Sequence, residues 1–259
     1  MLGCFLVVLV ALFFDESREL EVTRHRFGPE KGSTRWRIAQ VSDLHLLGKA
    51  EVEAKTVQVL NQEPLDLLVL TGDIVTHRER MADLGLFLQR LPGGTQKIAI
   101  LGNWEYWAGI NPRDLRAYYA RHGVTLLVNE SMVVGGEAGR ELLVVGLDDA
   151  RGGRPDWERA VADHPEWEGP MLILAHNPLT LHVIPAKVHQ KAQRLMLAGH
   201  THGGQIVVFG LHARREYPCL SGWCNGLVMP LYVSRGIGTS VIPLRLNARP
   251  ELPLFEWRW

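Results

Sequence analysis

The chain lacks several features that would narrow its class at once. Lys plus Arg equals Asp plus Glu at 28 each, so the formal net charge is zero. A neutral chain exerts no long-range attraction on nucleic acid or on an anionic membrane surface. We therefore expect no nucleic-acid partner, and any phosphate recognition has to come from local groups. The 259 residues show no repeat and no low-complexity tract, and a hydrophobic content of 46% suits one ordinary globular domain.

Cysteine is also scarce, with only Cys4, Cys219 and Cys224. Three is a poor count for a disulfide framework, and Cys219 with Cys224 lacks the second ligand pair that a zinc ribbon needs. We therefore expect free or packing thiols, with a small loop disulfide as the alternative.

A long apolar run is present only at the N-terminus, over Leu2–Phe14. As a helix it would reach about 20 Å, short of the roughly 30 Å hydrocarbon core of a bilayer. No Lys or Arg precedes it and no small-residue cleavage site follows it, so a cleaved signal peptide fits badly. We interpret residues 1–20 as a membrane-anchor-like segment, because a core helix would normally show a polar face. A first helix buried against the domain is the alternative.

From Arg37 onward short apolar runs alternate with amphipathic stretches. This alternation predicts parallel strands with covering helices, in one domain over residues 35–259. Strands are predicted to start at Arg37, Leu65, Lys97, Met171 and Leu195, and a hairpin at Met132 and Leu142. Helices are predicted over residues 50–62, 81–91, 111–122 and 155–164, the third with Asn111 as its cap and Pro112 at its first position.

Five predicted strands end in residues that can ligate a metal ion. Carboxyl ends of parallel strands converge on one crevice, and residues i and i+2 of an extended segment share a face. Each residue alone has an ordinary explanation as a turn or surface residue, but their joint placement favours one site. The residues are Asp43, His45, Asp73, Asn103, His176, His200 and His202.

Oxygen and imidazole ligands without thiolate suit two divalent metal ions of the Mn, Fe or Zn class. Seven ligands are too many for one tetrahedral ion and about right for two ions that share a carboxylate. Two ions roughly 3.5–4 Å apart can hold a hydroxide and clamp phosphoryl oxygens during in-line displacement. The expected substrate is therefore a phosphorylated small molecule or lipid, and no serine or cysteine nucleophile is required.

These motifs resemble those of the calcineurin-like metallophosphoesterase superfamily. The matching segments are Asp43-Leu-His45, Gly72-Asp73, Gly102-Asn103, His176 and Gly199-His200-Thr-His202. The resemblance implies an α/β fold, a four-layer αββα sandwich of the metallo-dependent phosphatase type. It implies that Asp43, His45 and His202 hold one metal, and Asn103, His176 and His200 the other. Asp73 would bridge the metals, and Asp73, Asn103 and His200 would count as catalytic.

The tail from Val233 to Glu251 is similar to a bacterial membrane-associated branch of this family, which includes UDP-2,3-diacylglucosamine pyrophosphatases of lipid A synthesis. This implies a location at the cell inner membrane, peripheral or through a single N-terminal anchor. Basic residues after the apolar run favour a cytoplasmic catalytic domain; they are Arg18, Arg24, Arg26 and Lys31. A broad-specificity membrane-associated phosphodiesterase and a non-catalytic scaffold are the alternatives, although a scaffold would be expected to have lost ligands.

One position departs from the family pattern, which has histidine where this chain has Trp104. That histidine is thought to stabilise the transition state or protonate the leaving group, which indole cannot do efficiently. A phosphate monoester with a second pKa of about 6 can leave unassisted, whereas an alkoxide, with a conjugate acid near ~15.7, needs a proton or a metal. Our hypothesis is a pyrophosphate or another ester with a good leaving group; alternatively, His77 or His182 substitutes.

Two further residues are candidates for substrate binding. Trp104, with Tyr106 and Trp107, could form an aromatic wall for a nucleobase or acyl chain, or simply pack the loop. Arg235 lies in a glycine-rich turn and is the candidate for a phosphate contact, with a structural salt bridge as the alternative.

Overall fold

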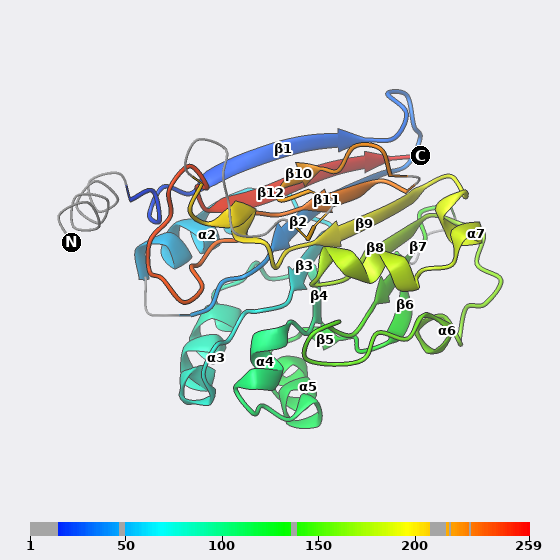
Figure 1. Ribbon diagram of the computed structural model, residues 1–259. Helices are drawn as coiled ribbons and strands as arrows, with labels where there is room; N and C mark the ends of the chain where they lie inside the picture. The colour runs from blue at the N-terminus through cyan, green and yellow to red at the C-terminus, as the bar shows by residue number, and fades with distance from the viewer. Residues whose placement is uncertain (1–14, 47–49, 136–138, 208–215, 218, 228) are drawn as a thin grey trace.

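The computed structural model describes residues 15–46, 50–135, 139–207, 216–217, 219–227 and 229–259 (Figure 1). The apolar run Leu2–Phe14 lies outside these ranges. None of the helices in the described ranges has the length and apolar character needed to cross a membrane.

Two six-stranded sheets form the middle of the molecule. The first has the order β1-β12-β2-β3-β4-β5, in which β2 to β5 are parallel and β12 is antiparallel to β2. Its strands are β1 (Glu21–Phe27), β2 (Arg35–Val41), β3 (Leu67–Thr71), β4 (Gln96–Ile100), β5 (Thr125–Leu126) and β12 (Glu251–Arg258).

The second sheet has the order β10-β11-β9-β8-β7-β6. Strands β7, β8, β9 and β11 are parallel, and antiparallel partners close both edges. Its strands are β6 (Glu130–Val134), β7 (Leu142–Gly146), β8 (Met171–Leu174), β9 (Arg194–Ala198), β10 (Gly222–Trp223) and β11 (Leu231–Val233).

Alternating residues of the buried strands place apolar side chains on both faces of each sheet. In β3, Leu67 and Val69 belong to a core shared by the two sheets, whereas Leu68 and Leu70 face the helices. The helices on the first sheet are α2 (Ala50–Gln62), α3 (Met81–Gln89), α4 (Asn103–Trp107) and α5 (Pro112–Arg121); those on the second are α6 (Trp157–Ala160) and α7 (Ala186–His189). Short 3-10 helices are η1 (Arg78–Arg80), η2 (Pro178–Val183) and η3 (His202–Gly204). The fold is therefore the expected four-layer αββα sandwich.

Most predicted elements are present, and three predictions need correction. The helix predicted over residues 155–164 is the single turn α6, capped by Asp156, because the chain turns again at Val161. Strand β1 pairs with β12, so the sheet begins at Glu21, ahead of the boundary expected at residue 35. Cys219 and Cys224 form a disulfide rather than free thiols, since the loop before β10 brings their Cα atoms to 5.5 Å.

Candidate metal centre

The seven predicted ligands lie at the carboxyl ends of five strands, which point to the left in Figure 1. Backbone hydrogen bonds join the segments after the strands. Asp43 N–H donates to Gly72 O over 3.1 Å, and His45 N–H donates to Asp73 O over 3.0 Å. In the second sheet, Gly199 N–H donates to His176 O over 2.9 Å. The strand ends thus hold the ligand loops in register with one another.

Six of these side chains form two groups, and all six are buried. In the first, Asp43 Oδ1 lies 3.3 Å from His202 Nε2, which lies 3.1 Å from His45 Nε2. The second contains Asp73, His176 and His200. His176 Nε2 lies 3.0 Å from Asp73 Oδ2 and 3.2 Å from His200 Nδ1.

Asp73 lies between the two groups. Its Oδ2 is 3.0 Å from His176 Nε2 and 4.0 Å from His45 Nε2. Its Oδ1 accepts a hydrogen bond from the backbone N–H of Trp104 over 2.8 Å. One carboxylate therefore faces donors from both groups while the backbone fixes its orientation.

Hydrogen bonds select the imidazole nitrogens that face the centre. His176 Nδ1 lies 2.8 Å from the carbonyl oxygen of Thr71, which can only accept, so His176 Nδ1 carries a proton in either protonation state and Nε2 is the nitrogen whose lone pair can bind a metal. His45 Nδ1 lies 2.9 Å from Thr76 Oγ1, whose own proton goes to His45 O. This again leaves the Nε2 lone pair for a metal, because a ligating histidine usually donates its other N–H.

Asn103 supplies a buried oxygen without a partner among the described residues. It begins α4, directly after β4, and is 1% exposed, yet its Oδ1 accepts no hydrogen bond from the described part of the chain. Buried polar atoms without partners are rare and indicate an absent ion or water. Amide and carboxylate oxygens with neutral imidazoles suit divalent cations of the Mn, Fe or Zn class, so these residues fit such ions.

The backbone at the ligands is strained. Five of the seven have positive φ, between 51° and 71°, where L-residues are disfavoured; they are Asp43, His45, Asp73, His200 and His202. The glycine before Asp73 is required by space, because a Cβ on Gly72 would lie 2.6 Å from Gly102 N and 2.8 Å from His176 Nδ1. Strained backbone of this kind persists only where the surrounding structure holds it in place, and it is common at functional sites.

The charges of the second group are mutually stabilising. Burial opposes the charged form of His176, but the charge and hydrogen bond of Asp73 hold the pKa of that imidazole well above its usual value. Burial likewise opposes the charge of Asp73, but His176 lowers the pKa of that carboxyl overall. A cation bound here would replace the proton of His176 as the partner of Asp73.

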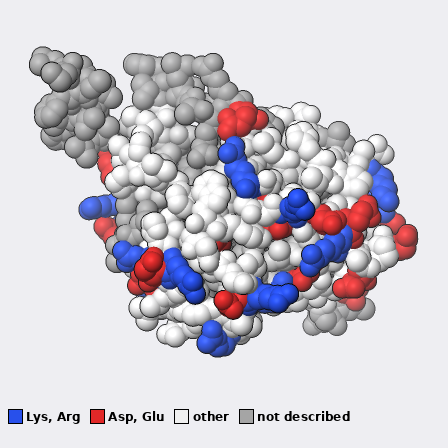
Figure 2. Space-filling model, turned by 60° about the horizontal axis from the view of Figure 1, so that its bottom comes forward, with Lys and Arg blue, Asp and Glu red and all other residues white. Residues whose placement is uncertain are grey.

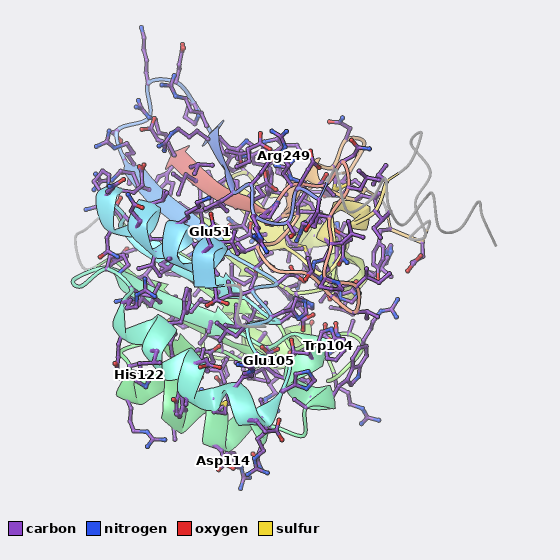
Figure 3. All side chains as sticks on the ribbon, turned by 90° about the vertical axis from the view of Figure 1, so that its left-hand side faces the viewer. Glu51, Trp104, Glu105, Asp114, His122 and Arg249 are labelled. Atoms are coloured by element: carbon purple, nitrogen blue, oxygen red, sulfur yellow. A yellow bond between two sulfur atoms is a disulfide. The ribbon has the colours of Figure 1, made fainter. Side chains whose placement is uncertain are left out.

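Glu105 positions the ligand loops, a role that the sequence analysis did not assign. Its carboxylate is buried and accepts four backbone N–H groups over 2.7–3.1 Å; they belong to Asp73, Ile74, Val75 and Gly102. Burial, followed by the charge of Asp73, raises the pKa of Glu105 to about 7. This side chain ties the loop after β3 to the loop after β4, next to Trp104 (Figure 3). The glutamate that follows Trp104 in the sequence was the available signal.

We expect Glu105→Ala to lower the free energy of unfolding by on the order of 4 kcal/mol, because each buried N–H left without an acceptor costs about 1–3 kcal/mol and water compensates in part. Bound metal should fall with it. Urea denaturation and metal analysis measure the two effects. Glu79→Ala, at an exposed glutamate of η1, is the matched control and should change neither. Unchanged stability of Glu105→Ala would contradict the assigned role.

Asp149 is a second buried carboxylate near this centre. It follows β7, whose neighbour β8 leads to His176. Its Oδ1 accepts from the backbone N–H groups of Arg151 and Gly152, whereas Oδ2 is buried without a partner among the described residues. Burial raises the pKa of Asp149, opposed by the charge of His176. An Asp-Asp pair after a buried strand was the available signal.

Arg245 supports the site from the C-terminal segment. Its guanidinium is fully buried and donates to backbone carbonyls that include Gly238 O and Ala248 O; its Nη2 lies 3.3 Å from His202 Nδ1. Burial lowers the pKa of Arg245 to about 10. A buried arginine that bonds mainly to carbonyls fixes the loop that packs against His202.

The two predicted substrate-binding residues lie in different surroundings. The ring of Trp104 is half-buried, 6.0 Å from the ring of His45 and 5.3 Å from that of Trp107, so it lines the centre. The guanidinium of Arg235 contacts Glu21 Oε2 at 2.6 Å and Glu251 Oε2 at 3.5 Å. Arg235 therefore makes the salt bridges that were the alternative interpretation, and a phosphate would have to compete with two carboxylates.

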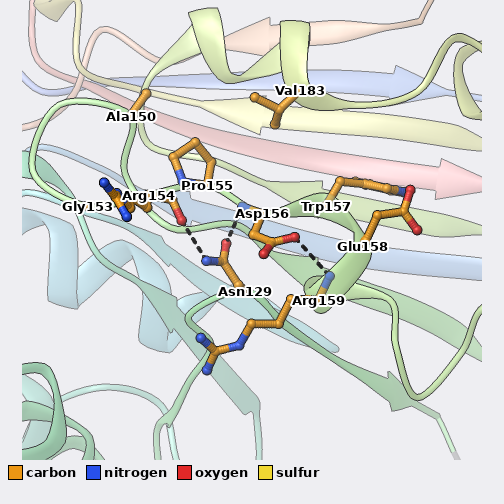
Figure 4. Close-up of a pocket in the computed structure, with 10 residues that line it drawn as sticks. All are labelled: Asn129, Ala150, Gly153, Arg154, Pro155, Asp156, Trp157, Glu158, Arg159 and Val183. Atoms are coloured by element: carbon orange, nitrogen blue, oxygen red, sulfur yellow. Dashed lines mark hydrogen bonds between the residues drawn. The ribbon is translucent and has the colours of Figure 1, made fainter.

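A cavity of about 700 Å³ next to Pro155 contains none of the seven ligands (Figure 4). Asn129 forms one wall, donating to Arg154 O over 2.7 Å and accepting from the N–H groups of Asp148 and Asp156 over 3.0 Å. These bonds fix the loop that carries Asp149, and Asp156 caps α6. The residues that line the cavity therefore hold the Asp149 loop in place, and the cavity itself contains no predicted ligand.

The chain is similar to known proteins over most of its length. The family model described as calcineurin-like phosphoesterase matches residues 37–204. The metallophosphoesterase YkuE of Bacillus subtilis (strain 168) is 28% identical over 253 residues, which cover 93% of this chain and 86% of that protein. The phosphodiesterase YaeI of Escherichia coli (strain K12) is 29% identical, covering 91% and 87%. A transmembrane protein with metallophosphoesterase domain from Bos taurus is 30% identical, covering 90% and 55%.

Proposed function

The chain belongs to the calcineurin-like phosphoesterase family and is a metal-dependent phosphoester hydrolase, and from that premise we propose that it hydrolyses a phosphodiester or pyrophosphate bond at a dinuclear metal centre. The observation that carries the proposal is the pair of adjoining buried donor groups with Asp73 between them. Asp43, His45 and His202 would hold one ion; Asn103, His176 and His200 would hold the other, with Asp73 shared.

Two bound cations supply a Lewis acid for phosphoryl oxygens and lower the pKa of water, so that a nucleophile forms near neutral pH. The chain itself orients and shields that chemistry. Glu105 fixes the backbone of Asp73, and the protons on Nδ1 of His45 and His176 direct their Nε2 atoms to the centre. The ring of Trp104 covers His45 edge-on, which limits the access of water from that side.

The preferred substrate has a good leaving group. Trp104 cannot donate a proton, and the side chains of His77 and His182, the alternative donors, are exposed rather than buried in the centre. A pyrophosphate releases a phosphate monoester with a second pKa of about 6, which needs no general acid. A UDP-2,3-diacylglucosamine-type pyrophosphate of lipid A synthesis is the specific candidate. The name of the relative YaeI, a phosphodiesterase, supports the broader candidate of a phosphodiester.

The proposed location is the inner membrane, with the catalytic domain on the cytoplasmic side. The apolar run Leu2–Phe14 supports membrane association, as does the name of the Bos taurus relative, a transmembrane protein with this domain. The disulfide between Cys219 and Cys224 argues for the opposite side, because disulfides persist in oxidising compartments. Labelling with a membrane-impermeant reagent in intact and permeabilised cells would decide between the two sides.

A substrate panel with metal-depleted and reconstituted protein tests the proposal. We expect full loss of hydrolysis after chelation and recovery with Mn, Fe or Zn. In the reconstituted protein, UDP-2,3-diacylglucosamine should be hydrolysed faster than bis-p-nitrophenyl phosphate, and both faster than p-nitrophenyl phosphate. Hydrolysis of the monoester alone would overturn the substrate class, and full turnover by metal-free protein would overturn the dinuclear centre.

A further inference from the structure

Two exposed apolar residues form the tip of the loop between β11 and β12. Val241 is 86% exposed and Ile242 47%, and both are branched side chains that water disfavours. Single exposed apolar residues are common, whereas these two are adjacent and place their apolar surface together in one loop. We refer to residues 240–243 as the apolar tip.

Hydrogen bonds from the side chain of Gln205 fix the backbone of the apolar tip. The side chain of Gln205 accepts from Ser240 N–H over 2.9 Å and donates to Ser240 O and Ile242 O over 3.0 and 2.7 Å. Arg245 bonds the base of the same loop to Gly238 and Ala248. Because both sides of the tip are fixed, the exposure of Val241 and Ile242 belongs to the folded structure.

Val241 is also strained. Its φ is +62°, a region in which a β-branched residue is a genuine outlier and glycine or asparagine is favoured. An exposed side chain on a strained backbone does not stabilise the folded protein. Strained residues of this kind cluster at functional positions, which makes Val241 a candidate for a role outside the fold.

The loop that carries the tip joins the metal centre to the N-terminal segment. Gly238 N–H donates to Asp43 O over 2.7 Å, and Gln205, which holds the tip, lies three residues after His202. On the other side, Arg245 N–H donates to Asp15 Oδ1 over 3.0 Å. Asp15 directly follows the apolar run Leu2–Phe14 in the sequence. The loop that carries the tip therefore contacts both the centre, at Asp43, and the first described residue of the chain, Asp15.

From this arrangement we propose that Val241 and Ile242 insert into a lipid bilayer and thereby set the metal centre at the membrane surface. This inference rests on the proposed function in that it presents the centre to a lipid-borne phosphate ester. We choose a bilayer as the partner of the tip because the sequence contains a second element suited to lipid, the apolar run. Asp15, the residue that follows this run, is bonded to the loop that carries the tip.

Charge adds little to this contact. Among the described residues near the loop, Arg249 is ion-paired with Glu16 and Glu19, Arg235 is ion-paired with Glu21 and Glu251, and Arg245 is buried. In Figure 2 basic and acidic side chains are interspersed over the visible face, with no large area of one sign. Insertion should therefore depend on apolar surface, and added phosphatidylglycerol or salt should change it little.

An environment-sensitive fluorophore on the full chain tests the proposal without turnover. Val241→Cys, in a Cys4→Ser background whose other cysteines form the disulfide, is labelled and mixed with phosphatidylcholine vesicles. We expect a blue shift of the emission and quenching by lipid-borne quenchers. The matched control is a label on Glu30→Cys, which is exposed in the turn between β1 and β2 at the opposite end and should show neither. A vesicle-bound protein whose label at residue 241 stays in water would overturn the proposal, as would a failure to bind vesicles.

Two substitutions give an independent measurement. Val241→Ser with Ile242→Ser should weaken vesicle binding about 100-fold or more, since two apolar side chains leave the lipid, and leave hydrolysis of soluble bis-p-nitrophenyl phosphate unchanged. Val241→Gly should weaken binding while keeping or raising the thermal midpoint, because it relieves the strained φ. Leu86→Ser, at an exposed apolar residue of α3, controls for general loss of apolar surface.

The outcomes separate this proposal from the proposed function. A deeply inserted label on a protein without phosphoesterase activity would contradict the proposed substrate and leave the membrane contact standing. Equal vesicle binding by the double serine variant and the unaltered chain would overturn the contact alone. A dimer that dissociates in the serine variant would overturn it too, because a second copy would then cover the tip.

Discussion

Replacing Asp73 with asparagine is expected to lower phosphodiester hydrolysis by about 10³-fold or more, since loss of even one electrostatic contact to the transition state costs about 10²–10³-fold. Asp73 is the carboxylate that faces donors of both groups, at 3.0 Å from His176 Nε2 and 4.0 Å from His45 Nε2. Asparagine keeps the shape and can still accept the Trp104 N–H, but it removes the negative charge. Metal analysis should show fewer ions per chain than in the unaltered protein.

The matched control is Asp148→Asn, at another buried carboxylate on the same edge. Asp148 accepts from Tyr106 Oη, Asp149 N–H and Arg154 N–H, so both of its oxygens are satisfied within the chain. Its replacement should cost stability but keep the bound metal. If Asp73→Asn loses its metal and retains full biological function, the scaffold interpretation gains and the hydrolase assignment for this centre is lost.

The sequence predicted that these seven residues would lie together, because each of them comes within a few residues of the carboxyl end of a buried strand. Their position depends on a local rule, in which an apolar run ends and a polar residue begins at the carboxyl edge of a parallel sheet. Helices α2, α3 and α5 were predicted for the same local reason, and Asn111 caps α5 through its bond to Arg113 N–H. Local periodicity and capping are enough for such elements.

Features that depend on contacts distant in sequence could not be predicted in this way. Strand β1 pairs with β12, which lies near the other end of the sequence, and no local pattern predicts that pairing. The role of Glu105 was not predicted, because it comes from N–H groups of a loop about thirty residues away. Arg245 resembles a surface residue in the sequence and is fully buried in the fold. Tertiary proximity decided each case.

The disulfide was mispredicted for a related reason. An odd number of cysteines argues against a framework only when each cysteine is equally able to pair. Cys4 lies in the apolar run, whereas Cys219 and Cys224 lie on either side of β10. The pair closes a small loop beside Tyr217, whose ring lies 5.6 Å from that of His200. The disulfide therefore stabilises a segment next to the metal centre.

The second large effect is expected on the rate of hydrolysis when Trp104 is replaced by histidine (Trp104→His). If no general acid acts in this protein, its rate should fall steeply as the pKa of the leaving group rises across a series of aryl and alkyl phosphodiesters. The substitution Trp104→His should then accelerate hydrolysis of the alkyl esters, since a positioned general acid contributes about 10²–10⁴-fold. Esters with good leaving groups, including the pyrophosphate, should change little because their departure needs no proton.

The position of Trp104 makes this experiment interpretable. Its backbone N–H holds Asp73 Oδ1, and this bond does not depend on the side chain, while its ring lies 6.0 Å from the ring of His45. An imidazole at this position would therefore project toward the first group of ligands without disturbing Asp73. Trp104→Phe is the matched control, because it keeps an aromatic ring but offers no proton. A shallow dependence on leaving group in the unaltered protein would show that another residue donates the proton. His77→Ala and His182→Ala would then identify it, and the preference for a pyrophosphate would lose its basis.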